Sequence, residues 1–139
     1  VNGDLGFLEV IKKECPNIDV FGTNIYSGAS SRDLFDRVEK ELGVPLLYAE
    51  FGADAYDAKR DREDHISQAR YLQSLWQEIY EHSYGKGRAQ NAIGGLIFQW
   101  SDGWWKYQQE INLDVQDTTA SWSNAAYPHD WTEDGNNMN

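Results

Sequence analysis

Glu50 stands near the end of VPLLYAEFG, an apolar run of strand length that spans residues 44–52. So little alternation between apolar and polar residues is typical of a strand buried on both faces, as in parallel sheets. Barrels and open α/β folds carry their chemistry at the carboxyl ends of such strands. Glu50 is therefore a candidate catalytic residue. The alternative is a strand-end carboxylate that meets a lysine or faces solvent.

Two further strand-like runs end in side chains that complement a carboxylate. The run 18–26 ends in Tyr26, and the run 92–100 ends in Trp100. If the three strands are parallel neighbours, their ends meet on one rim. A carboxylate, a phenol and an indole around one hollow suit a sugar ring. The carboxylate can attack the anomeric carbon, the phenol can hold the carboxylate, and the indole face can pack against the sugar.

Helical segments alternate with these strands. Apolar residues at helical spacing predict helices over 5–15, 30–42 and 64–81. Ser30, with Asp33 three residues later, resembles a capping box at the start of the second helix.

The third predicted helix follows a charged stretch, residues 53–64, which is too long for a routine turn and is interpreted as a working loop or a lid. Asp64 is the expected cap of this helix. Its buried face is expected to include Trp76 as a core residue.

The order helix, strand, helix, strand, helix, strand predicts right-handed βαβ units and a parallel sheet. Three strands make less than half of an eight-stranded barrel, which needs about 250 residues. The expected fold class is therefore α/β, a partial (β/α)8 TIM barrel. Residues 1–139 would form a single truncated fragment, in which 101–139 are an extended loop and tail. The missing strands would come from a lost part of the chain, a second copy in a homo-oligomer, or a second polypeptide.

The composition limits the kinds of ligand and partner that the chain is expected to bind. The net charge of -11 argues against nucleic acid and anionic membranes, and a neutral ligand fits better. The single cysteine, Cys15, excludes an internal disulfide. His65, His82 and His129 lie on predicted helices or in the tail, so neither a metal site nor a cofactor is expected. The sequence leaves the compartment open, with an extracellular or periplasmic location favoured.

Three motifs together resemble a known enzyme family. Residues 19–26 (DVFGTNIY), residues 45–52, and the stretch from Gly94-Gly95 to Trp100 look like strands six, seven and eight of the (β/α)8 retaining glycoside hydrolases. The resemblance is greatest to the family 2 catalytic domain, whose members include β-galactosidases, β-glucuronidases and β-mannosidases. It extends over nearly the whole chain.

The resemblance implies roles for individual residues. Glu50 matches the glutamate nucleophile that closes strand seven, and Tyr26 matches the strand-six tyrosine that hydrogen-bonds it. Trp100 matches the strand-eight aromatic residue of the innermost sugar subsite, with Phe98 as the other candidate on that strand.

Three more residues near these strand ends are candidates for substrate binding. Asn24 and Asp102 are expected to form hydrogen bonds on the rim. Trp104 is a candidate for an outer sugar subsite, although adjacent tryptophans also serve as loop anchors.

One part of the family pattern has no counterpart in the sequence. Retaining glycosidases use two carboxylates about 5–5.5 Å apart. In the resembled family, the acid/base is a glutamate after an asparagine at the end of strand four, and no Asn-Glu pair closes a strand here. Asp54 and Asp102 are weak substitutes. The chain alone is therefore expected to be feeble or inactive. The open alternatives are a glucanosyltransferase on the same barrel and a non-catalytic carbohydrate-binding half-barrel.

Overall fold

The structure is a computed structural model that describes residues 5–53, 56–57 and 62–100 of the chain. The elements in chain order are η1 (Leu5–Phe7), α1 (Leu8–Glu14), β1 (Phe21–Ile25), α2 (Leu34–Glu41), β2 (Leu46–Phe51), β3 (Tyr56–Asp57), β4 (Arg62–Glu63), α3 (His65–Glu81) and β5 (Ala92–Ile97).

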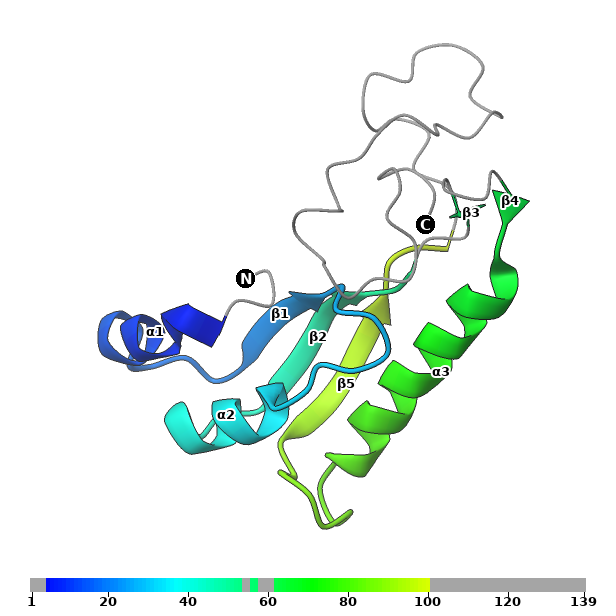
Figure 1. Cartoon of the computed structure of the whole chain (residues 1–139). Helices are drawn as coiled ribbons and strands as arrows, with labels where there is room; N and C mark the ends of the chain where they lie inside the picture. The colour runs from blue at the N-terminus through cyan, green and yellow to red at the C-terminus, as the bar shows by residue number, and fades with distance from the viewer. Residues whose placement is uncertain (1–4, 54–55, 58–61, 101–139) are drawn as a thin grey trace, which may run out of the picture.

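Three strands form one parallel sheet in the order β1-β2-β5 (Figure 1). The sheet therefore has β2 at its centre, between the two strands whose ends were expected to complement Glu50. The alternation of helices and parallel strands confirms the α/β class, and it is compatible with part of a barrel. The short strands β3 and β4 form a separate antiparallel pair within the stretch predicted as a loop.

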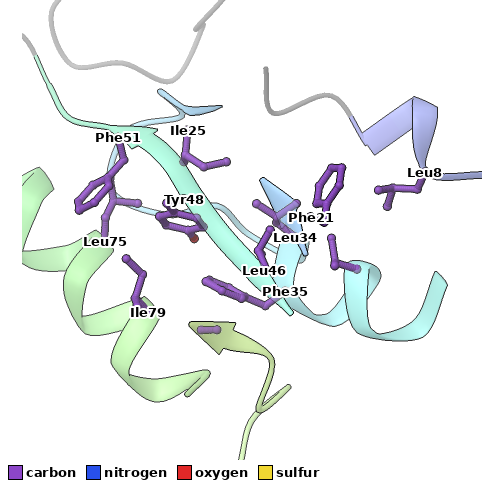
Figure 2. Packing of buried hydrophobic residues seen from close by; sticks show 12 residues of the cluster. Leu8, Phe21, Ile25, Leu34, Phe35, Leu46, Tyr48, Phe51, Leu75 and Ile79 are labelled. Carbon is purple, nitrogen blue, oxygen red and sulfur yellow. The ribbon is translucent and has the colours of Figure 1, made fainter. Parts of the chain in front are cut away.

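One face of the sheet supplies the hydrophobic core (Figure 2). Burial alternates along β1, where Phe21, Thr23 and Ile25 are buried and the residues between them are half-exposed. The helices cover this face with a set of fully or almost fully buried side chains: Leu8, Leu34, Phe35, Val38, Leu75 and Ile79. In the described part of the chain, β2 is thus not buried equally on both faces, contrary to the expectation from its composition.

Among the sequence-based boundaries that change are those of the second helix and of the last strand. The second helix begins at Leu34 and not at Ser30, and its first residue is preceded by Asp33, which makes no side-chain capping hydrogen bond. The predicted capping box is therefore wrong, because the Ser30 hydroxyl instead donates to Glu78 Oε1 at 2.8 Å. The last strand ends at Ile97 and not at Trp100.

The third helix begins as predicted. Asp64 caps it by accepting hydrogen bonds from the Ser67 amide at 3.0 Å and from the Ser67 hydroxyl at 2.8 Å. Trp76 is not a core residue, because it is 41% exposed. Its ring system packs against Phe51 in a T-shaped arrangement, with 5.3 Å between the centroids. Within the described residues, no helix combines the length and apolarity needed to cross a membrane.

Candidate active site at the carboxyl ends of the strands

An extra residue in β2 decides where Glu50 points. Thr23 pairs with Tyr48, and the next residue of β1, Asn24, pairs with Glu50, so Ala49 is skipped in the register. On the other side of β2, Tyr48 pairs with Gly95 and Phe51 with Ile97, so three steps on β2 again match two on its neighbour. Both neighbours therefore indicate a bulge in the same part of the strand.

The pattern of buried and half-buried residues along β2 agrees with this bulge. Leu46 and Tyr48 are buried in the core, and the next core residue is Phe51, whereas Glu50 is half-buried. Strict alternation would continue from Leu46 and Tyr48 to Glu50 and would direct its carboxylate toward the helices. The extra residue instead directs Phe51 into the core and leaves Glu50 on the other side.

Glu50 meets Tyr26 at the carboxyl end of the sheet. Tyr26 follows the last residue of β1, and its hydroxyl donates a hydrogen bond to Glu50 Oε2 at 3.0 Å. The two residues are 24 positions apart in the chain, so the parallel pairing of β1 and β2 brings them together. This is the contact implied by the family resemblance.

The segment just after β5 lies against Gly52, the residue that follows Phe51. The Phe98 amide donates to the Phe51 carbonyl oxygen at 2.8 Å, one residue beyond the end of β5. A Cβ atom on Gly52 would lie 2.3 Å from the Phe98 carbonyl oxygen. Glycine is therefore required at this position, because any side chain would collide with backbone atoms. The absence of a side chain lets the two chain segments approach closely beside Glu50.

The other predicted substrate-binding residues are placed unequally. Asn24 is half-buried and is the register partner of Glu50, and Phe98 is half-buried beyond the end of β5. Trp100 is fully exposed, with no part of its ring system buried. Asp102 and Trp104 lie outside the described residues, as does Asp54. The structure thus brings Tyr26, Glu50 and Asn24 together, whereas Trp100 does not pack against the described part of the chain.

A second carboxylate network lies behind this site and was not anticipated from the sequence. The Tyr48 hydroxyl lies 2.9 Å from Glu78 Oε2 and 2.7 Å from Ser31 Oγ. Because a carboxylate only accepts, the phenol donates to Glu78, and the Ser31 hydroxyl donates to the phenol oxygen. Burial and the neighbouring Glu78 charge raise the pKa of Tyr48 far above its usual value, so the phenol stays protonated.

The described residues contain no candidate metal centre. No group of three or more His, Cys, Asp or Glu side chains could hold a metal ion there.

A shallow hollow of about 220 Å³ lies near the start of β2, at the opposite end of the strand from Glu50. It is lined by Lys12, Cys15, Pro16, Ile18, Leu42 and Val44. Its position separates it from the Tyr26–Glu50 pair.

Comparisons with known proteins give one structural similarity. No protein family matches the sequence, and no curated protein matches it. Among solved structures, a β-glucuronidase from Ruminococcus gnavus is similar, with a TM-score of 0.44 and 23% sequence identity. The similarity covers 63% of this chain and 16% of the β-glucuronidase chain. Similarity at this level assigns no activity to the chain.

Proposed function

We propose that this chain carries the nucleophile of a retaining β-glycosidase, and that the nucleophile is Glu50. The observation that carries the proposal is the 3.0 Å hydrogen bond from the Tyr26 hydroxyl to Glu50 Oε2 at the carboxyl ends of parallel strands. The sequence resemblance to family 2 glycoside hydrolases assigns the same pair to the same roles.

In the proposed reaction, a Glu50 carboxylate oxygen attacks the anomeric carbon and forms an ester with the sugar. The bond to the leaving group breaks at the same carbon, and the departing oxygen takes a proton from a second carboxylic acid. Water then attacks the anomeric carbon, gives its proton to the second carboxylate and releases Glu50. The resembled family supplies that acid/base from strand four, which has no counterpart in this sequence.

Tyr26 has two tasks in this scheme. Its hydroxyl fixes the rotation of the Glu50 carboxylate by donating to Oε2, so that the attacking oxygen is held in one direction. In the second step, the same donor stabilises the negative charge that returns to the carboxylate. The proposed sugar contacts are Asn24, Phe98, Trp100, Asp102 and Trp104. Asn24 is the register partner of Glu50.

The test uses a panel of 2-deoxy-2-fluoro-β-glycosides that carry a dinitrophenolate leaving group. Dinitrophenolate leaves without protonation, so labelling does not depend on a general acid, and the fluorine slows hydrolysis of the ester. Incubation with the chain, intact mass measurement and peptide mapping are expected to show one adduct on Glu50. Glu50→Gln is expected to give no adduct, and the reactive sugar would identify the substrate class.

The remaining outcomes separate the alternatives. Sugar binding without an adduct, unchanged in Glu50→Gln, would support a non-catalytic carbohydrate-binding module. An adduct that is released faster by added sugar acceptors than by water would favour a glucanosyltransferase. An adduct on a residue other than Glu50 would contradict the proposed nucleophile.

A further inference from the structure

The segment between Tyr26 and α2 is held by a single carboxylate from a distant helix. Ser30 donates from its hydroxyl to Glu78 Oε1 at 2.8 Å, and Ser31 donates from its backbone amide to Glu78 Oε2 at 2.9 Å. Glu78 lies on α3, 47 residues after Ser31 in the chain. One side chain thus ties the loop after β1 to the helix that precedes β5.

The same carboxylate also holds β2. Tyr48 is fully buried and donates to Glu78 Oε2 at 2.9 Å. Tyr48 is two residues before Glu50, while Ser30 is four residues after Tyr26. Glu78 therefore contacts both the loop that follows Tyr26 and the strand that carries Glu50, although it lies on neither β1 nor β2.

The loop has a conformation that needs such a tie. Arg32 has a φ angle of 60°, in the left-handed region that residues other than glycine rarely adopt. Its amide donates to the Ser30 hydroxyl oxygen at 2.9 Å, and the Ser27 hydroxyl donates to the Ser30 carbonyl oxygen at 2.9 Å. Ser30 thus connects the Glu78 carboxylate to Ser27, the residue directly after Tyr26. Unfavourable backbone angles persist only where the surroundings over-determine them.

We infer that Glu78 is a positioning residue for the Tyr26–Glu50 pair: it fixes the loop that begins at Tyr26 and the strand that carries Glu50 relative to each other. The catalytic part of this inference rests on the proposed function. Glu78 would touch neither the sugar nor the reacting atoms, so its effect must pass through the Tyr26–Glu50 contact.

The decisive variant is Glu78→Gln, which keeps the size of the side chain. An amide has one acceptor oxygen, so it cannot accept from Ser30, Ser31 and Tyr48 as the carboxylate does. The matched control is Glu81→Gln on the same helix. Glu81 accepts from Gln77 and pairs with Arg88, and within the described residues it makes no hydrogen bond to the loop or to β2. Circular dichroism and urea unfolding establish that each variant is folded under the assay conditions.

Labelling kinetics with the most reactive fluoroglycoside give the first readout. We expect Glu78→Gln to lower kinact, the limiting rate constant of labelling, by about tenfold or more, because a hydrogen-bonded alignment is lost. The Ki for the fluoroglycoside should change little, and Glu81→Gln should behave like the wild type. In a Tyr26→Phe background, Glu78→Gln should lower kinact much less, because the contact through which it acts is already gone.

Two results would overturn the inference: an unchanged kinact in Glu78→Gln, or an equal loss of kinact with and without the Tyr26 hydroxyl. If the wild type gives no adduct, the proposed function fails. The role of Glu78 in fixing the loop is then tested separately, by amide hydrogen exchange over residues 26–33. Faster exchange in Glu78→Gln than in Glu81→Gln would support the tie between loop, strand and helix. Equal exchange in the two variants would refute it.

Discussion

Asn24 of β1 pairs with Glu50 of β2, although one step earlier Thr23 pairs with Tyr48. Consecutive residues on one strand thus face residues two apart on the other. This offset places Glu50 on the side of the sheet opposite Tyr48, where it meets the Tyr26 hydroxyl. The chemistry proposed here depends on this offset. With regular alternation along β2, the Glu50 side chain would lie on the same face as Tyr48, and Tyr26 and Glu50 would point to opposite faces of the sheet.

Removing the Tyr26 hydroxyl should slow the proposed first step without preventing it. A hydrogen bond to a charged group contributes about 1.5–3 kcal/mol, so Tyr26→Phe is expected to lower kinact about 10- to 100-fold. The measurement is the time course of the mass adduct at saturating fluoroglycoside. Tyr84→Phe, at an 89% exposed tyrosine, is the control and should label at the wild-type rate. A Tyr26→Phe variant that labels normally would remove Tyr26 from the mechanism.

The close approach at Gly52 should be sensitive to one added carbon. Gly52→Ala would place a Cβ atom 2.3 Å from the Phe98 carbonyl oxygen, and backbone atoms cannot move aside as a flexible side chain can. We expect a loss of about 1–3 kcal/mol in the free energy of unfolding. Gly22→Ala is the matched control on the same sheet, since its Cβ would lie 3.6 Å from the Ala49 Cβ, an ordinary contact. Urea denaturation of both variants measures the difference; equal stabilities would show that the two segments separate easily.

The buried Tyr48 hydroxyl should contribute to stability. Tyr48→Phe leaves Glu78 Oε2 without its phenol donor and leaves the Ser31 hydroxyl without the phenol oxygen as acceptor. An unsatisfied buried polar group costs about 1–3 kcal/mol, which is the expected loss in the free energy of unfolding. The exposed Tyr84→Phe should lose almost nothing by the same urea assay. A Tyr48→Phe variant as stable as the wild type would mean that water replaces the phenol in this network.

His82 should make the stability fall in mildly acidic solution. It is buried and stacks on Phe35 with 4.4 Å between ring centroids, and burial lowers the pKa of His82 below its usual value. The charged groups that also influence His82 are Asp36, Arg88, Glu78 and Glu81, among which only Arg88 lowers its pKa.

As the pH drops below about 6.5, the unfolded chain binds a proton at this imidazole and the folded chain resists it, so folding is disfavoured. His82→Gln should therefore show a weaker decrease in stability than the wild type between pH 7.5 and 5.5. Chemical denaturation at several pH values measures this slope. Parallel curves for the two proteins would exclude His82 as the source.

The general architecture could be predicted from the sequence because it follows from periodicity. The apolar runs that end near Tyr26 and Glu50 become neighbouring parallel strands, and Asp64 caps the third helix as expected. Strands of this kind are determined by short-range patterns of apolar residues, which a single sequence displays directly.

The features that depend on tertiary contacts could not be predicted in this way. Ser30 has the spacing of a capping residue, yet its hydroxyl donates a hydrogen bond to the Glu78 carboxylate, 48 positions later in the chain. The bulge at Ala49 leaves no trace in the composition of β2, because alanine fits either an ordinary or a bulged position. Trp76 fits the apolar face of the helix by spacing but lies at its margin, where 41% of its surface stays exposed.

The bulge also limits how this pair could be moved to another protein. A designer who grafted a tyrosine and a glutamate onto two adjacent parallel strands at matching positions would copy the residues and lose the geometry. The additional residue at Ala49, which both neighbouring strands accommodate, would have to be transferred with them. Without that spacer, the transplanted carboxylate would be directed into the interior of its new host, where an unpaired charge is strongly unfavourable.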